Sequence, residues 1–115
     1  MNRFIEGKNE WYLNQRFYGV RDALEITKKE LSAAKSTRDV ETFNNLRDNY
    51  GAELRSLPAF DAADRVMSKL YKLKRTLQAS KLPDRQDKID LIDERIRLVQ
   101  TKALSFYTEA VKEAH

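Results

Sequence analysis

The sequence contains no cysteine, and its only histidine is the C-terminal residue, His115. Without cysteine, the chain can form neither disulfide bonds nor thiolate metal sites. Chain ends are often poorly ordered, so a histidine at that position is a weak candidate for a catalytic base or a ligand. We therefore predict no metal site.

The sequence motifs of common enzyme classes are also missing. There is no glycine-rich phosphate loop and no serine or cysteine nucleophile with a histidine nearby. No pair of acidic residues stands isolated in apolar surroundings, as a general acid and base would require. We expect a protein that is not an enzyme, with no catalytic residues, no cofactor and no small-molecule substrate.

Long apolar runs are absent as well. No segment approaches the roughly 20 apolar residues that span a bilayer, and the first eleven residues, "MNRFIEGKNEW", lack the apolar core of a signal peptide. The sequence predicts no membrane partner.

Glycine and proline are scarce, with three and two residues, whereas 35% of the chain is charged. This composition is typical of long, solvated helices. A chain of 115 residues is long enough for one compact domain. We therefore predict a single all-α domain over residues 1–115.

Apolar residues in the first half of the chain recur in alternating steps of three and four, which places them on one side of a helix. The pattern predicts helices over about 9–35 and 38–55, joined by the polar turn "KSTRD". The predicted inward positions are Leu13, Phe17, Val20, Leu24, Thr27, Leu31 and Ala34, followed by Val40, Phe43, Leu46, Tyr50 and Leu54.

Pro58 predicts a break after the second helix, because proline removes a backbone donor and disfavours an α conformation at Leu57. Ser56 is a candidate cap there. Two further helices are predicted over about 58–80 and 83–113, separated by "SKLPD". Their inward positions are Ala59, Ala63, Val66, Leu70, Leu73 and Leu77, then Ile89, Ile92, Ile96, Val99, Ala103, Phe106 and Ala110.

The apolar stripes also match each other across the predicted turns. If the chain folds back about Lys81, Leu70 faces Ile92; a fold-back about Thr37 places Leu31 opposite Phe43. The pattern favours two antiparallel helical hairpins that form a four-helix bundle. The alternative is a three-helix coiled-coil bundle with a broken middle helix, and the choice depends on how strongly Pro58 bends the chain.

An acidic cluster opens the last predicted helix, "DKIDLIDERIRLVQTKAL". On a helix, Asp87, Asp90 and Glu94 share one face, where a metal bridged by carboxylates can be imagined. Metal-binding bundles of this type also use histidine, however, and the acids here alternate with the isoleucine stripe. We interpret the cluster as a solvated face whose charge suits the start of a helix.

A basic segment, "SKLYKLKRTLQASK", ends the third predicted helix. Clustered cations beside an aromatic ring can follow a phosphate backbone, so this segment is a candidate nucleic-acid surface. In the predicted hairpin it lies beside the acidic start of the last helix, which offsets much of its charge. The candidate residues are Lys69, Lys72, Lys74, Arg75 and Lys81.

Several aromatic and other large apolar residues fall outside the predicted stripes. If they are exposed together they form a patch for a protein partner, because aromatic side chains often dominate interface energetics. The alternative for the aromatics of the first helix is packing at the end of the bundle. The candidates are Trp11, Tyr12, Tyr18, Phe60, Met67 and Tyr71.

The order of these elements resembles the C-terminal helical region of large polyvalent proteins and internal virion proteins of phages and mobile elements. The resemblance rests on "RFYGVRDAL", "LRDNYGAEL", "DRVMSKLYKLKRTL" and "RQDKIDLIDERIRLVQTKAL". It implies a packing or assembly role in a chain that is delivered with DNA, located in the phage virion or the host cytoplasm.

We therefore expect an interaction or structural module that binds a protein partner or a second copy of itself. One alternative is a small nucleic-acid-associated protein that uses its basic helix face. Another is a small phage-encoded inhibitor of a host protein.

Overall fold

The computed structural model describes the backbone of residues 3–114 and the side chains of residues 12–113. Its four helices are α1 (Arg3–Ser36), α2 (Val40–Leu54), α3 (Leu57–Ala79) and α4 (Arg85–Ala114). The predicted all-α four-helix bundle is confirmed. The helix bounds agree with the sequence to within two residues, except at the start of α1, which begins six residues earlier than predicted.

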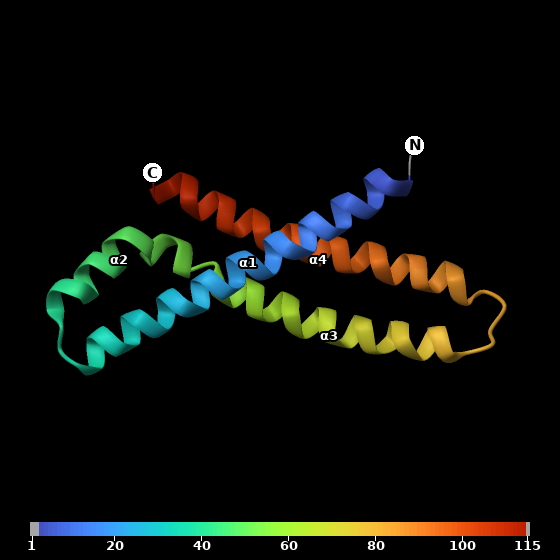
Figure 1. Ribbon diagram of the computed structural model, residues 1–115, viewed down its shortest axis with the longest axis horizontal. Helices are drawn as coiled ribbons and strands as arrows, with labels where there is room; N and C mark the ends of the chain where they lie inside the picture. The colour runs from blue at the N-terminus through green and yellow to red at the C-terminus, as the bar shows by residue number, and fades with distance from the viewer. Residues whose placement is uncertain (1–2, 115) are drawn as a thin grey trace.

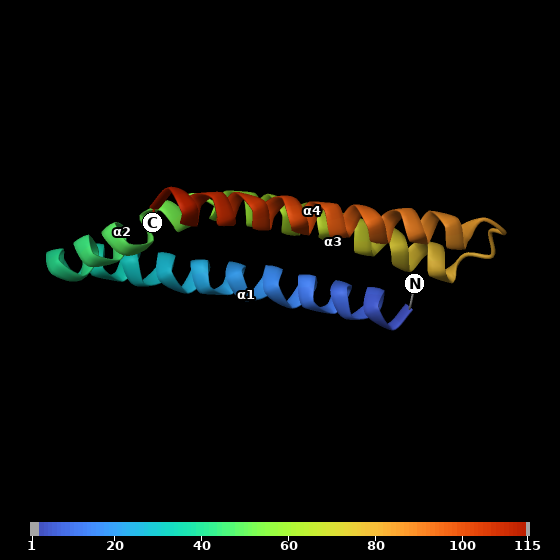
Figure 2. The same ribbon diagram turned by 90° about the horizontal axis from the view of Figure 1, so that it is seen from above.

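The helices form two layers (Figures 1 and 2). The antiparallel α3–α4 hairpin makes one layer, and α1 crosses it diagonally in the other, while α2 returns beside the second half of α1 and also contacts α4. The molecule measures 61 × 30 × 18 Å. A helix with its side chains is about 10 Å across, so the shortest dimension of the molecule holds only two layers of helices. Every helix therefore keeps one side towards solvent.

The turn between α1 and α2 closes with a Schellman motif. The Arg38 N–H donates to the Lys35 carbonyl at 3.3 Å, and the Asp39 N–H donates to the Ala34 carbonyl at 2.9 Å. This pattern needs a left-handed residue, and Arg38 fills the place with φ of 60°. Asp39 then caps α2, because its carboxylate accepts hydrogen bonds from the Thr42 N–H at 3.2 Å and the Thr42 hydroxyl at 2.7 Å. These bonds hold the pKa of Asp39 below its ordinary value.

Only Arg55 and Ser56 separate α2 from α3, and the chain bends there (Figure 1). Ser56 occupies the predicted cap position, but its buried hydroxyl donates back to the Glu53 carbonyl at 2.6 Å instead of capping α3. Pro58 follows in the first turn of α3, where no backbone donor is needed. The second hairpin turns at residues 80–84, which is the predicted segment "SKLPD".

The core lies where α1 crosses the hairpin. Phe17, Phe60 and Met67 are fully buried at this crossing. The buried cluster around them also contains Leu24, Leu57, Ala63, Ile92, Ile96, Ala103 and Leu104. Two polar contacts fix the helix positions: the Gln100 amide donates to Asn14 Oδ1 at 2.8 Å, and Lys74 Nζ lies 2.7 Å from Asp93 Oδ1.

Five predicted inward positions are wrong: these side chains are 45–66% exposed instead of buried. In general, a bundle only two layers deep leaves one side of each helix uncovered. Helix α3 also meets α1 and α4 on two different sides, so it buries a second stripe beyond the one that the heptads indicate. Phe60 and Met67 belong to that second stripe. The five exposed residues are Val40, Tyr50, Val66, Leu73 and Phe106.

Candidate interaction surface

A shallow groove of about 350 Å³ runs between α3 and α4, and all of its lining residues come from these two helices. Val66 is 45% exposed, whereas its neighbour Met67 is fully buried, so the groove lies on the side of α3 that faces away from the α1 crossing. We call it the outer groove; its lining is Ala59, Ala62, Ala63, Val66, Val99, Lys102, Ala103 and Phe106.

Alanine forms half of that lining, and larger apolar side chains stand beside it. Phe106 on α4 is 53% exposed, so about half of its surface is open to solvent. Leu73, one heptad after Val66, continues this exposed side of α3. In total, five large apolar side chains of the hairpin helices are 45–62% exposed: Val66, Leu73, Leu91, Leu98 and Phe106.

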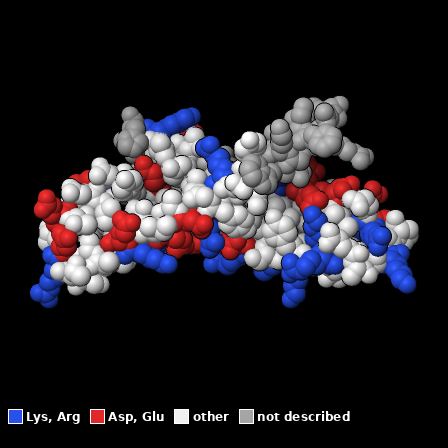
Figure 3. All heavy atoms as spheres, viewed as in Figure 1, with Lys and Arg blue, Asp and Glu red and all other residues white. Residues whose placement is uncertain are grey.

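The predicted basic segment does not form one continuous face. Lys69 and Lys72 are exposed on α3, about 60° and 120° around the helix from the groove residue Val66, and Lys81 is exposed in the following turn. Lys74 instead points to α4 and pairs with Asp93. Arg75 is also exposed, about 100° further around the helix from Lys74. Figure 3 shows Lys and Arg side chains projecting along the lower right edge of the molecule, over α3.

Sequence reasoning missed a second row of cations on α4. Lys88, Arg95 and Lys102 are all exposed and recur every seven residues, so they lie along one side of the helix. Lys102 lines the outer groove itself. On α3, Arg65 extends the row of Lys69 and Lys72. The heptad spacing in α4 was a visible signal, but only the packing places it beside the groove.

The candidate partner-binding residues do not form one patch. Phe60 and Met67 are fully buried in the core, so the prediction that they contact a partner is wrong. Phe60 faces Phe17 of α1, because α3 packs against α1 in the other layer as well as against α4 in its own. Tyr71 is half-buried against the core, and Tyr12 is 61% exposed on α1. The Trp11 side chain lies outside the described residues.

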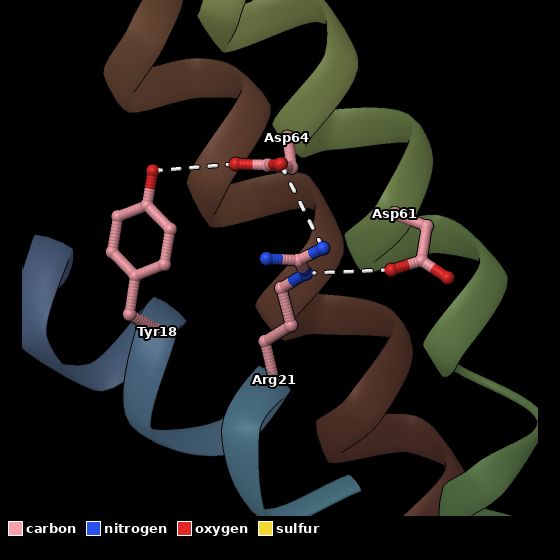
Figure 4. A network of polar contacts seen from close by, with 4 residues as sticks. All are labelled: Tyr18, Arg21, Asp61 and Asp64. Atoms are coloured by element: carbon pink, nitrogen blue, oxygen red, sulfur yellow. Dashed lines mark hydrogen bonds and ion pairs between the residues drawn. The ribbon is translucent and has the colours of Figure 1, made fainter. Parts of the chain in front are cut away.

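Tyr18, the remaining candidate, belongs to a polar network between α1 and α3 (Figure 4). Its hydroxyl donates to Asp64 Oδ1 at 3.4 Å. Arg21 Nε donates to Asp61 Oδ1 at 3.3 Å, and Arg21 Nη2 lies 3.7 Å from Asp64 Oδ2. Burial raises the pKa of Tyr18, and the negative charge of Asp64 raises it further. The network ties α1 to the hairpin, and it directs both acids of α3 towards α1.

Asp87, Asp90 and Glu94 are exposed at the start of α4. Figure 3 shows acidic side chains gathered along the upper edge of this part of the helix, away from α3. Within the described residues, no group of three or more His, Cys, Asp or Glu side chains is placed to hold a metal ion. The acids are arranged as a solvated helix face.

A second apolar hollow, of about 390 Å³, lies at the α1–α2 turn. It is lined by Ala34, Val40, Phe43 and the polar residues of the turn, and Val40 is 66% exposed. It involves the tip of one hairpin, whereas the outer groove and the exposed apolar residues around it extend along two long helices. We therefore regard the outer groove as the main candidate site.

No family model matches the chain, and no curated protein or solved structure is significantly similar to it. The resemblance to large polyvalent and internal virion proteins therefore rests on sequence motifs alone. No helix in the described part of the chain has the length and apolar character that crossing a membrane requires.

Proposed function

We propose that the chain is a non-enzymatic helical interaction module that binds a protein partner through the outer groove. One observation carries the proposal: an apolar groove, with Val66 and Phe106 about half exposed, remains uncovered along two helices. Contiguous apolar surface on a soluble domain often marks a binding site. The opposite side of the same hairpin is already covered by α1.

The resemblance to phage and mobile-element proteins supplies the proposed context. In that context, the partner is another component of the phage particle or a host protein. A phage-encoded inhibitor would bind its host protein through the same groove. Nucleic-acid binding has less support. Lys74, one of its five candidate residues, is engaged with Asp93, and apolar walls separate the remaining cations of α3 from those of α4.

A comparison of three immobilised proteins in host lysate tests the proposal. We expect a protein that is captured by the wild type to be lost with Phe106→Arg, which places a charge on the groove wall. Ile26→Arg, at a residue 57% exposed on α1, is the matched control and should retain the captured protein. Circular dichroism checks that both variants are folded. Equal capture by all three proteins would contradict a role for the groove.

A further inference from the structure

The shape of the outer groove suits a third helix. Its floor contains Ala59, Ala62, Ala63 and Ala103, and small side chains allow another helix to approach within the usual 8–10 Å. Val66 and Phe106 stand above this floor on opposite helices. A groove between two helices with such walls accepts an amphipathic helix through anchors spaced three and four residues apart.

Cations border the groove on both sides. On α4, Lys102 lines the groove, and Arg95 and Lys88 follow on the same side of the helix towards the hairpin turn; we call these three residues the α4 rim. On α3, Lys69, Arg65 and Lys72 are exposed about 60–120° around the helix from Val66, and we call them the α3 rim. Among the described residues, Lys88 pairs with Asp84 at 3.6 Å, and the other five rim residues form no ion pair. The groove is therefore an apolar strip between two positive edges.

The acids of the hairpin are directed elsewhere. Asp61 and Asp64, the only acids of α3, contact Arg21 on α1, and Asp93 contacts Lys74. The α4 rim ends at Glu109, seven residues after Lys102, and Glu109 pairs with Lys112 at 3.8 Å. No acid of the described residues lies between Lys88 and Lys102 on the α4 rim. The positive rims therefore keep their charge for a ligand.

This charge pattern selects among occupants. A second copy placed on the same face would set basic rims against basic rims, and such like-charge contacts oppose association. A phosphate backbone would satisfy the rims but would leave the apolar strip between them in contact with charge. Resting on the proposed function, we infer that the outer groove binds an amphipathic α-helix of a partner protein whose flanks are acidic. Its apolar stripe covers the groove, and its carboxylates meet both rims.

Two designed peptides test the inference on the full chain. Both are amphipathic helices about three heptads long with the same leucine and alanine stripe, and their flanking positions are all Glu in one and all Lys in the other. Fluorescence anisotropy should show binding of the Glu peptide at least about tenfold tighter than that of the Lys peptide, with a preference that shrinks as salt is added.

Charge reversal of the rims should exchange this preference. With Lys69→Glu and Lys102→Glu combined, we expect weaker binding of the Glu peptide and stronger binding of the Lys peptide. The matched control combines Lys28→Glu and Lys29→Glu, at exposed positions on α1, and should bind as the wild type does.

The remaining outcomes separate the inference from the proposed function. Equal binding of both peptides, or binding of neither, overturns the inference that the partner helix has acidic flanks. The proposed function, protein binding in the outer groove, still stands in that case if Phe106→Arg abolishes capture from lysate. Light scattering that shows a dimer lost in Phe106→Arg would assign the groove to a second copy and overturn the inference. Duplex DNA binding that the rim reversal abolishes, without peptide binding, would overturn it in favour of nucleic acid. If capture does not depend on Phe106, the proposed function itself fails.

Discussion

Phe17 on α1 and Phe60 on α3 are both fully buried, and their ring centroids lie 5.1 Å apart. The two rings connect the two layers at the centre of the molecule. Aromatic pairs at this distance contribute about 0.5–1.5 kcal/mol beyond the area that they bury. The contact also decides which side of α3 faces the core, and hence which side is left as the outer groove.

Replacing Phe60 should therefore destabilise the whole domain. For Phe60→Ala we expect a loss of about 3–5 kcal/mol in the free energy of unfolding, because the change leaves a cavity in the core. Urea denaturation followed by circular dichroism measures it. Phe106→Ala is the matched control on the exposed face, and it should cost no more than about 1 kcal/mol. Similar losses in the two variants would show that α3 is oriented differently.

The turn between α1 and α2 should be improved by glycine. Arg38 has φ of 60°, which costs a residue with a side chain about 1 kcal/mol. Glycine adopts this conformation freely but loses more entropy on folding. For Arg38→Gly we expect a net gain of about 0.5–1 kcal/mol in unfolding free energy. Arg47→Gly, inside α2, should instead lose about 1 kcal/mol. A loss in both variants would contradict the left-handed turn.

Tyr18 should make the domain sensitive to alkaline pH. Because its pKa is raised in the folded state, its contribution to stability is present below the ordinary pKa of 10.0 and is lost as the pH rises through the folded pKa. We expect the unfolding free energy to fall between about pH 9 and about pH 11, and to fall less in Tyr18→Phe. Denaturation at the two pH values measures the change, and Tyr12→Phe is the exposed control.

Ultraviolet titration of the tyrosines tests the cause of this shift. Asp64→Asn removes one of the two largest contributions to the raised pKa, the negative charge beside the hydroxyl. Tyr18 should then ionise at lower pH than in the wild type. Its pKa should nevertheless stay above the ordinary value, because burial is the larger cause. An unchanged titration in Asp64→Asn would show that the hydroxyl does not contact this carboxylate.

The isoleucines of α4, rather than its acids, should be essential for folding. Ile92 is 6% exposed, and a carboxylate in its place would be buried without a partner. We expect Ile92→Asp to abolish the cooperative unfolding transition, since the cost approaches the whole stability of a typical domain. Asp90→Asn, at an exposed position, should change the unfolding free energy by less than about 0.5 kcal/mol. The reverse outcome would indicate that the acidic cluster has a structural or binding role of its own.

The helices and all of their ends except the start of α1 were predictable because their causes are local. Steps of three and four mark a helix, and Pro58 and the polar turn at Thr37 interrupt it, whatever lies around them. The pairing into two hairpins followed from the short turns. The left-handed Arg38 was not foreseen, because glycine or asparagine usually signals this conformation.

The candidate site was only partly predictable. Val66 and Phe106 carry the same heptad signal as the buried Ile92 and Ile96, yet they line the outer groove. Phe60 and Met67 were expected to be exposed and are buried instead. The spacing of residues in one helix tells which side chains share a face, but it does not tell which neighbouring helix, if any, covers that face.

The sequence by itself determined an all-α chain of four helices in two hairpins, since helix periodicity and turn residues act within a few positions. Only the tertiary structure decided how one hairpin lies on the other. The diagonal crossing of α1 buries Phe17 against Phe60 and leaves the opposite side of α3 and α4 open. Such a crossing depends on how side chains from distant segments fit together, and no local pattern records that fit.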